Sequence, residues 1–381
     1  MIATEEAGLL ERLDLLAPDI VGLARDIGEH PELGYEEHYA VSRIAGLLER
    51  HGEPVRTGLA GLPTALSAGD DAPTPRIAIL AEYDALPGIG HACGHNLIAA
   101  AAVGAFLALR STGAEPSARL LGCPAEESTV PEAGGKIKLL EAGEFDRTCA
   151  AVMMHPYERH AIVSLGAYAA RGVDFVFHGR AAHAAMAPED GRNALDAAVA
   201  TYTAVSQLRQ QLPASVRVHG IITDGGQSPN VIPERAAMRY RIRCESSGAL
   251  EDVSRRVVAC AEGAALATGT ALEVVEFMPP YAEMRQDPAL ARVGSEAMAD
   301  LGLTTRGSEH LRFGSSDLGN VSHRLPALEL GIGIPGSSAG PHTPEFAAAA
   351  LSDAGLSSAV DGAKAIALTV LRYRRGPASH D

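Results

Sequence analysis

The sequence contains no tryptophan, and aromatic residues together make up 4% of it. The hydrophobic core must therefore be built from alanine, valine, leucine and isoleucine. Cysteine is also scarce, with five residues in the chain. They stand far apart and form no CxxC pair. This usage argues against a disulfide framework and is typical of a reducing compartment. Cys123, Cys149, Cys244 and Cys260 are expected to pack as small buried side chains.

Basic residues are outnumbered, with 32 lysines and arginines against 47 aspartates and glutamates and a net charge of −15. The absence of a basic stripe disfavours binding to nucleic acids and to anionic membrane surfaces. The longest apolar stretch, Leu97 to Leu109, is too short to span a bilayer. The charged start, Met1 to Asp19, predicts an amphipathic helix rather than a secretion signal. We therefore expect a cytoplasmic protein without nucleic-acid or membrane partners.

Short apolar runs that alternate with helical patterns predict an α/β fold with a mostly parallel sheet. The four clearest runs are Arg76–Leu80, Ala118–Gly122, Ala150–Met154 and Ala327–Ile334. A polar cluster follows each run, and ligands bind outside the carboxyl ends of the strands in such sheets. We therefore expect the polar side chains of four separate segments to meet at one edge of the sheet.

The pattern changes in the middle of the chain. Alternating segments and one helical segment predict a ferredoxin-like α+β domain, and these segments are 173–177, 194–208, 216–222 and 236–244. Since the last run of the parallel sheet follows them, this domain is inserted into the first one. A chain of 381 residues usually exceeds one core.

We therefore expect two domains. The first is a discontinuous catalytic domain over residues 1–170 and 283–381, and the second is an inserted domain over residues 171–282. The Pro279-Pro280 pair is predicted to form the hinge at which the chain returns to the first domain.

The segment from Glu82 to Asn96 carries side chains that bind metals. Cys93 and His95 stand two residues apart, and thiolate and imidazole are preferred ligands of borderline-soft divalent cations. Asn96 is placed to cap the helix that follows, which would fix this turn. The start of that helix is also expected to lower the pKa of the Cys93 thiol.

Further ligands follow the other strands. Adjacent carboxylates such as Glu126 and Glu127 point in different directions at a strand end, so one can bind a metal while the other faces a water molecule. His155 and His342 each stand beside a proline that restricts the backbone. With Cys93, His95 and Glu127 they make five ligands, which is enough for two metals that share a bridge.

The motifs of the chain resemble those of the aminoacylase, carboxypeptidase G and auxin-conjugate amidohydrolase family of dinuclear metallopeptidases. They occur in family order over nearly the whole length, and they are Asp84-Ala85-Leu86-Pro87, His91-Ala92-Cys93-Gly94-His95, Pro124-Ala125-Glu126-Glu127, Gly179-Arg180-Ala181-Ala182-His183-Ala184, Pro229-Asn230-Val231-Ile232-Pro233 and His342-Thr343-Pro344-Glu345-Phe346. The resemblance implies that the metal ligands are Cys93, His95, Glu127, His155 and His342. It also implies that Glu126 is the general base and Asp84 a carboxylate behind the ligands.

The resemblance further implies that the inserted domain is a lid and forms a homodimer. His183 would reach the partner's site to stabilise an oxyanion, and Asn230 with Arg243 would hold the substrate's carboxylate. A guanidinium binds a carboxylate through two parallel hydrogen bonds. Arg239 and Arg241 share the alternating face of Arg243, so the choice among the three rests on the family's spacing.

Two departures from the family pattern are informative. Asn96 stands where many auxin-conjugate hydrolases carry aspartate, and with residues 313–320 it resembles the aminoacylase-like and aminobenzoyl-glutamate hydrolase branch. Glu82 stands where the aminoacylase branch has a metal-binding histidine. Whether Glu82 binds a metal stays open.

We predict an enzyme, a metal-dependent amidohydrolase that cleaves an N-acyl amino acid or dipeptide-like substrate through metal-activated water. Two divalent ions per subunit are expected, zinc or manganese, with cobalt or nickel as further options. A dipeptidase or a carbamoyl-amino-acid hydrolase could use the same residues. A cysteine hydrolase using Cys93, or a catalytically silent binding protein, are the alternatives from other classes.

Overall fold

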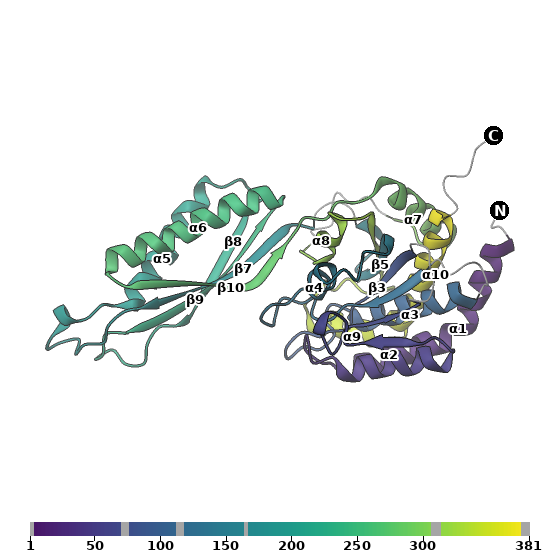
Figure 1. The fold of residues 1–381 in the computed structure, drawn as a ribbon, viewed down its shortest axis with the longest axis horizontal. Helices are drawn as coiled ribbons and strands as arrows, with labels where there is room; N and C mark the ends of the chain where they lie inside the picture. The colour runs from purple at the N-terminus through teal and green to yellow at the C-terminus, as the bar shows by residue number, and fades with distance from the viewer. Residues whose placement is uncertain (1–3, 70–75, 112–117, 164–166, 306–313, 375–381) are drawn as a thin grey trace. The chain divides into compact units, whose positions relative to one another are not determined.

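The computed structural model describes residues 4–69, 76–111, 118–163, 167–305 and 314–374. The chain forms two compact units, of which the first comprises Met1–Gly166, Met284–Phe313 and Asp317–Asp381. The second comprises Ala167–Glu283 together with Gly314–Ser316. Each unit has its own hydrophobic core. We call them the catalytic unit and the inserted unit, and Figure 1 labels their elements.

The catalytic unit contains a seven-stranded mixed sheet of order β1-β2-β4-β3-β5-β11-β6. Its strands are β1 (Val55–Thr57), β2 (Leu66–Ala68), β3 (Arg76–Ala81), β4 (Ala118–Gly122), β5 (Thr148–Tyr157), β6 (Ala161–Val163) and β11 (Ala327–Gly333). The four neighbouring strands β4, β3, β5 and β11 are parallel. They coincide with the four predicted runs, which confirms the α/β prediction, while the strands toward both edges pair antiparallel.

Helices surround this sheet. They are α1 (Thr4–Glu29), α2 (His38–Arg50), α3 (His95–Ser111), α4 (Gly135–Glu141), α7 (Pro288–Asp300), α8 (Leu318–Ser322), α9 (Pro344–Leu351) and α10 (Asp353–Arg374), with a short 3₁₀ helix at Leu59–Gly61. The alanine-rich α3 packs between α1, α10 and the strands. At Gly104 of α3, an added Cβ atom would lie 2.4 Å from Ile20 of α1. The small side chains of α3 therefore allow close packing of the helices.

Among the described residues, α10 is the one helix long and apolar enough to cross a membrane. However, 78% of its apolar window is buried inside the molecule. Core helices of large domains meet the same criteria of length and composition. In this structure α10 is a core helix that packs against α3 and α1.

The inserted unit has a four-stranded antiparallel sheet of order β10-β7-β9-β8. Its elements are β7 (Ala169–His178), α5 (Ala194–Leu208), β8 (Arg217–Asp224), β9 (Arg235–Cys244), α6 (Ser247–Thr268) and β10 (Ala271–Tyr281), with short 3₁₀ helices at Pro188–Asp190 and Arg209–Gln211. This βαββαβ order is that of the predicted ferredoxin-like fold. Alternate side chains of the strands, such as Phe175 and Tyr240, pack with α5 and α6 in one core.

Two predictions about local structure are wrong. Pro279 and Pro280 do not form a hinge, because they lie inside β10, an edge strand whose register shifts between Met278 and Tyr281. Edge strands and bulges tolerate proline because its missing N–H is not needed there.

The second wrong prediction is that Cys149 and Cys260 pack as buried side chains. Cys149 is exposed and Cys260 is partly exposed. Cys149 lies near the exposed start of β5, and Cys260 lies on a flank of α6 that is not fully covered.

Candidate metal centre

The predicted ligands converge at the carboxyl edge of the parallel strands. Cys93 and His95 follow β3, Glu127 follows β4, His155 lies near the end of β5, and His342 follows β11. Nitrogen, sulfur or oxygen atoms of Cys93, His95 and His155 lie within 4.8 Å of one another. The same limit holds for Cys93, Glu127 and His342. Because Cys93 belongs to both groups, the arrangement can accommodate two ions that share a ligand.

Contacts between ligand atoms support this grouping. Cys93 Sγ lies 3.4 Å from His155 Nε2. His342 Nε2 lies 3.3 Å from Glu127 Oε1, although the side chain of His342 is 55% exposed. Such separations allow two atoms to bind one ion at about 2.0 to 2.3 Å each.

Hydrogen bonds orient two of the imidazole rings. His95 Nδ1 lies 3.0 Å from Asp84 Oδ1, and His155 Nδ1 lies 2.9 Å from the Pro156 carbonyl oxygen. Both contacts assign the ring proton to Nδ1 and leave Nε2 as the ligand atom. Within the described part of the chain, the buried Nε2 of His95 has no hydrogen-bond partner. A buried polar atom without a partner fits a site that binds a metal.

Asp84 connects the two ligand-bearing turns. Its Oδ1 orients His95, and its Oδ2 accepts the backbone N–H of Glu127 at 2.9 Å. The carboxylate is 1% exposed, so its contacts are made without competition from solvent. Its position behind His95 is the one expected from the sequence.

Glu126 and Glu127 directly follow a strained residue, Ala125. Ala125 has φ of 53°, in the left-handed region that costs a non-glycine residue about 1 kcal/mol. Its N–H donates to the buried Glu37 Oε1 at 2.8 Å, which holds the turn in place. His342 also has a positive φ, 68°, and its N–H donates to the Ala92 carbonyl. Strain of this kind is retained where it orients functional side chains.

The electrostatic environment separates the roles of the side chains. Burial lowers the pKa of His155 to about 4, so its imidazole is neutral and available as a ligand at neutral pH. Burial and the adjacent carboxylates of Glu82 and Glu127 raise the pKa of Glu126 well above its usual range. For His95, burial favours the neutral ring, but Asp84 and Cys93 outweigh it and raise the pKa well above the usual range.

Two expectations about the turn that carries Cys93 are wrong. Asn96 lies inside α3 rather than at its cap, and its amide donates to the Ala24 carbonyl of α1 at 3.0 Å. The pKa of the Cys93 thiol is raised well above its usual range, because the side chain is buried and lies near Glu127. Burial and a nearby carboxylate therefore outweigh the effect of the helix terminus.

Sequence reasoning missed three buried residues beside the site. Glu37 holds the Ala125 turn, while Lys136 lies between Glu82 and Asp317. No local pattern around Glu37 indicates its burial. Lys136 stands in the helical segment Gly135–Glu141, which also carries exposed charges such as Glu141, so its context does not indicate burial. Asp317 lies in the family-like segment 313–320, of which Phe313 falls outside the described residues.

The residues predicted for substrate binding all lie in the inserted unit, but one chain does not bring them together. Asn230 lies beside His183, because the Ala184 N–H donates to the Asn230 carbonyl at 3.0 Å. Arg243 lies near the opposite end of β9, eight residues beyond the Arg235–His178 pair. At about 3.3 Å per residue this separation is roughly 26 Å. Within one chain Asn230 and Arg243 are therefore far apart, and their joint role in holding the substrate's carboxylate stays a prediction.

Two of the three candidate arginines of β9 differ in their contacts. Arg239 donates two hydrogen bonds of 2.8 Å to Asp174 and stacks on Phe277 at 3.4 Å from the ring centroid. For Arg243, no carboxylate partner is present among the described residues, and its Nε is buried without a hydrogen bond. Burial lowers the pKa of Arg243. Its charge is therefore less compensated than that of Arg239.

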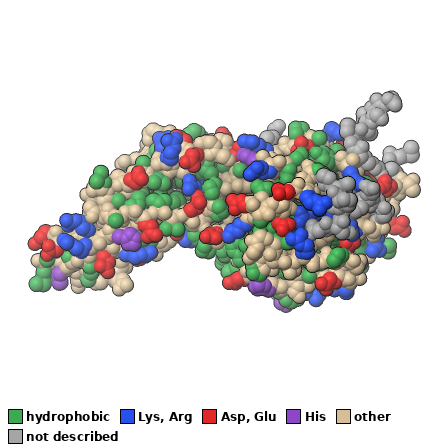
Figure 2. All heavy atoms as spheres, in the orientation of Figure 1, with side chains coloured by type: hydrophobic (Ala, Val, Ile, Leu, Met, Phe, Trp, Pro, Cys, Tyr) green, Lys and Arg blue, Asp and Glu red, His purple; other side chains and the backbone are tan. Residues whose placement is uncertain are grey.

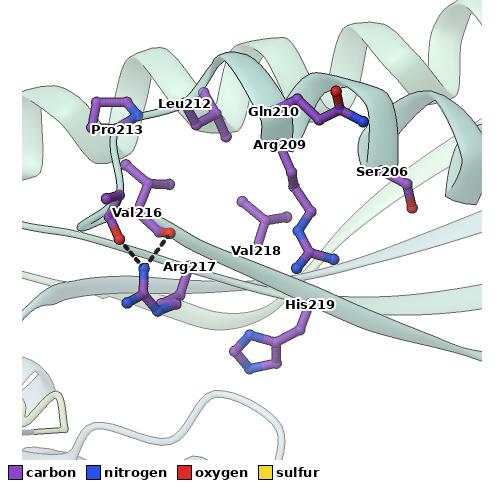
Figure 3. A pocket seen from close by; sticks show the side chains of 10 residues that line it. Ser206, Arg209, Gln210, Leu212, Pro213, Val216, Arg217, Val218 and His219 are labelled. Atoms are coloured by element: carbon purple, nitrogen blue, oxygen red, sulfur yellow. Dashed lines mark hydrogen bonds between the residues drawn. The ribbon is translucent and has the colours of Figure 1, made fainter.

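A pocket of about 500 Å³ lies next to this face, between the end of α5 and the start of β8. Figure 3 shows Arg209, Arg217 and His219 among its lining residues, with Arg217 donating to two backbone carbonyls. In the sheet register Arg217 pairs with Arg243 and His219 with Arg241. The positive charges of Arg209 and Arg217 favour an anion near Arg243, whereas burial and the nearby arginines lower the pKa of His219.

Comparison with known proteins identifies the family. Residues 165–268 match the model of a peptidase dimerisation domain. The chain is 39% identical to the Xaa-Arg dipeptidase of Mus musculus, over 95% of this chain and 87% of that protein. It is 29% identical to the N-acetyl-L-cysteine deacetylase of Bacillus subtilis, over 66% of this chain and 65% of that protein.

A solved structure has the same fold. A dinuclear metal-binding peptidase of the M20 family from Bacillus subtilis superposes with a TM-score of 0.69 at 24% identity, covering 95% of this chain and 99% of that one. The fold, the converging ligands and the relatives define a metal-dependent hydrolase that acts on amide bonds. The chain belongs to the M20 family of metallopeptidases, which confirms the family, the fold class and the class of reaction predicted from the sequence.

Proposed function

We propose that this protein hydrolyses the amide bond of an N-acyl amino acid or a dipeptide that ends in a free carboxylate. The observation that carries the proposal is the position of Glu126. One of its oxygens lies within 4.8 Å of ligand atoms of both His95 and Glu127. A carboxylate at this distance from a metal ligand set is within reach of a water molecule that reacts there.

The proposed ligands are Cys93, His95, Glu127, His155 and His342, and their atoms fit a pair of divalent ions. Divalent ions bound there would acidify water and polarise the substrate carbonyl. Sulfur and nitrogen donors favour zinc, while the carboxylate also suits manganese, and cobalt or nickel are further options.

Glu126 is the proposed proton carrier. Its raised pKa allows it to take a proton from the attacking water and to deliver it to the leaving amine. Asp84 would keep the His95 ring oriented throughout the reaction, because it binds the nitrogen opposite the ligand atom.

Arg243 is the proposed anchor of the substrate carboxylate. Arg239 is already engaged by Asp174, whereas the Arg243 guanidinium has charge available for an anion. A guanidinium binds a carboxylate through two charge-assisted hydrogen bonds, which fixes the orientation of the substrate as well as its affinity.

His183 is the proposed oxyanion donor and would come from the partner subunit of a homodimer. Its Nδ1 accepts the N–H groups of Ala185 and Met186, each at 3.2 Å. The ring proton is therefore assigned to Nε2, which can donate to developing negative charge. Asn230 lies beside His183 and would enter the same site from the same subunit.

The dimer contact is proposed to lie on α5 and the edge strand β8. Exposed hydrophobic side chains gather on these elements, namely Val199, Tyr202, Ile221 and Ile222. Such side chains are visible on the inserted unit in Figure 2. An unpaired edge strand with apolar neighbours is suited to pair with a second copy.

The test is hydrolysis of a substrate panel with and without a chelator. The panel comprises a dipeptide with C-terminal arginine, N-acetyl amino acids and N-carbamoyl amino acids. We expect amide hydrolysis that stops on chelation and returns with zinc, manganese or cobalt. No turnover of any panel member by the metal-loaded protein would contradict the proposal and favour a silent binding protein.

The same experiment tests a cysteine hydrolase. Cys93 is buried, and its raised pKa disfavours the thiolate in the absence of a metal. Activity that resists the chelator but is lost on alkylation of Cys93 would support that alternative. A cytoplasmic location stays a prediction.

A further inference from the structure

A lysine side chain is fully buried beside the candidate metal centre. Lys136 of α4 has 0% exposure, and its Nζ donates to Glu82 Oε1 and Asp317 Oδ1 at 2.5 Å each. Its backbone N–H donates to the other Asp317 oxygen at 2.9 Å. A buried ammonium is tolerated only when carboxylates compensate its charge. The three side chains therefore form one electrostatic unit.

This unit extends to Glu126. Carboxylate oxygens of Glu82, Glu126 and Asp317 lie within 4.8 Å of one another. Three carboxylates at this spacing are the ligand type that Mg²⁺ and Mn²⁺ prefer. The cluster could therefore hold a divalent ion if its cation were absent.

The second oxygen of Glu82 faces the candidate metal centre. Glu82 Oε2 is buried, has no hydrogen-bond partner among the residues that the structure describes, and lies 3.6 Å from His95 Nε2. The other oxygen, Oε1, accepts a hydrogen bond from Lys136. Without Lys136 the carboxylates of Glu82 and Asp317 would lose their buried cation, and the cluster would attract another one.

The lysine differs from a metal ion in two ways. It is covalently fixed, so it cannot exchange with ions in solution, and it donates hydrogen bonds without taking up the lone pairs of Glu126 by coordination. Burial favours the neutral amine, but Asp317 and Glu82 outweigh it and raise the pKa of Lys136 well above its usual range. The side chain therefore remains a cation.

We propose that Lys136 is a positioning residue whose ammonium occupies the cation position of the Glu82–Glu126–Asp317 cluster and so keeps Glu126 free of metal. The inference rests on the proposed role of Glu126 as the proton carrier. A coordinated Glu126 could not accept a proton from water, because the metal would hold the lone pairs that the proton needs.

The test is metal stoichiometry of the full-length protein in a Mn²⁺ titration, measured by equilibrium dialysis with elemental analysis. Lys136→Ala removes the ammonium and leaves space for an ion. Lys138→Ala is the matched control, because Lys138 lies on the same helix and pairs with exposed Glu132 at 3.1 Å. We expect two ions per subunit in the wild type and in Lys138→Ala, and three in Lys136→Ala.

Turnover at each Mn²⁺ concentration is the second measurement. In Lys136→Ala we expect turnover to fall at least tenfold as the third ion binds, while the wild type and Lys138→Ala keep a plateau. A loss that came only from altered folding would not follow occupancy of a third ion. A folded Lys136→Ala variant that binds two ions, with no additional inhibition by Mn²⁺, would overturn the inference.

A second variant covers the case in which Lys136→Ala does not fold. Lys136→Ala/Asp317→Asn removes one positive and one negative charge together, so the net charge of the cluster is kept. We expect it to bind the third ion through Glu82, Glu126 and the amide oxygen, and two ions in this folded variant would overturn the inference. If the wild type itself binds no metal and hydrolyses no panel substrate, the proposed function fails; if the wild type behaves as expected, only the role of Lys136 is at stake.

Discussion

The catalytic unit and the inserted unit differ in whether they bury charged side chains. Among its described residues, the catalytic unit buries ten charged side chains, which are Glu6, Glu37, Arg76, Glu82, Asp84, Arg119, Glu127, Lys136, Asp317 and Glu329. In the described part of the inserted unit, the buried polar side chains are Thr201 and Ser254, and none is charged. Buried charges cost free energy unless they are paired or used. The difference indicates that chemistry is concentrated in the catalytic unit.

The inserted unit keeps its charges at its surface. Arg239 and Arg243 stand on the face of β9 opposite the side chains that pack with α5 and α6. Charges on a face that a ligand can reach are suited to recognition. We therefore expect substitutions in the catalytic unit to affect turnover and metal binding, and substitutions in the inserted unit to affect substrate affinity.

The largest expected effect is that of Glu126→Gln. Loss of the proton carrier should lower kcat by about 10³-fold, within the range of general acid–base catalysis. Metal content should stay unchanged, because Glu126 is not a proposed ligand. Elemental analysis and steady-state kinetics measure the two quantities, with exposed Glu141→Gln as the control. Near-normal turnover of Glu126→Gln would refute the assignment.

The next effect concerns the stability of the catalytic unit. Burial raises the pKa of Glu329 to about 7, although a hydrogen bond from the Tyr157 hydroxyl opposes this shift. The folded state therefore binds a proton more tightly than the unfolded state does. Its stabilising effect is complete below the unfolded pKa near 4.5 and is lost as the pH rises through 7.

Glu329→Gln removes this dependence while keeping an acceptor for Tyr157. At pH 8 we expect the metal-free variant to be more stable than the wild type by about 3 kcal/mol, and at pH 5 by about 1 kcal/mol or less. Urea unfolding at both pH values measures this difference. Exposed Glu276→Gln of the inserted unit is the control. Equal stability of Glu329→Gln and the wild type at pH 8 would contradict the prediction.

A smaller effect is expected for Asp84→Asn. The amide can no longer serve both His95 and the Glu127 N–H as a carboxylate does, so metal affinity should fall by about 10- to 100-fold. Competition with a chromogenic chelator measures the affinity. Unchanged metal affinity would show that the His95 ring is held by its packing alone.

The smallest effect concerns the arginines of the inserted unit. Arg243→Lys should raise KM by about 10-fold with little change in kcat, because lysine cannot form the paired hydrogen bonds of a guanidinium. Arg239→Lys should leave KM within about threefold, since Arg239 is committed to Asp174. A larger rise in KM for Arg239→Lys than for Arg243→Lys would reverse the assignment.

Local sequence patterns predicted much of the fold. Strands β3 and β4 and helix α5 coincide with, or differ by one residue from, the predicted segments, because each has a strong period or apolar run bounded by turn residues. The chain passes between the two units after Gly166 and after Glu283. Pro279 and Pro280 were misread because sequence alone does not identify an edge strand with a bulge.

The metal-binding chemistry was determined by the sequence itself. Cys93 and His95 on one turn, Glu126 and Glu127 on another, and histidines after two further strands indicate a metal site wherever parallel strands share an edge. The tertiary structure alone decided what surrounds these residues. Lys136 and Asp317 are 181 residues apart and meet only when the chain closes on itself. Burial, strain at Ala125 and the separation of Asn230 from Arg243 likewise depend on packing and register. These are non-local properties that no local pattern encodes.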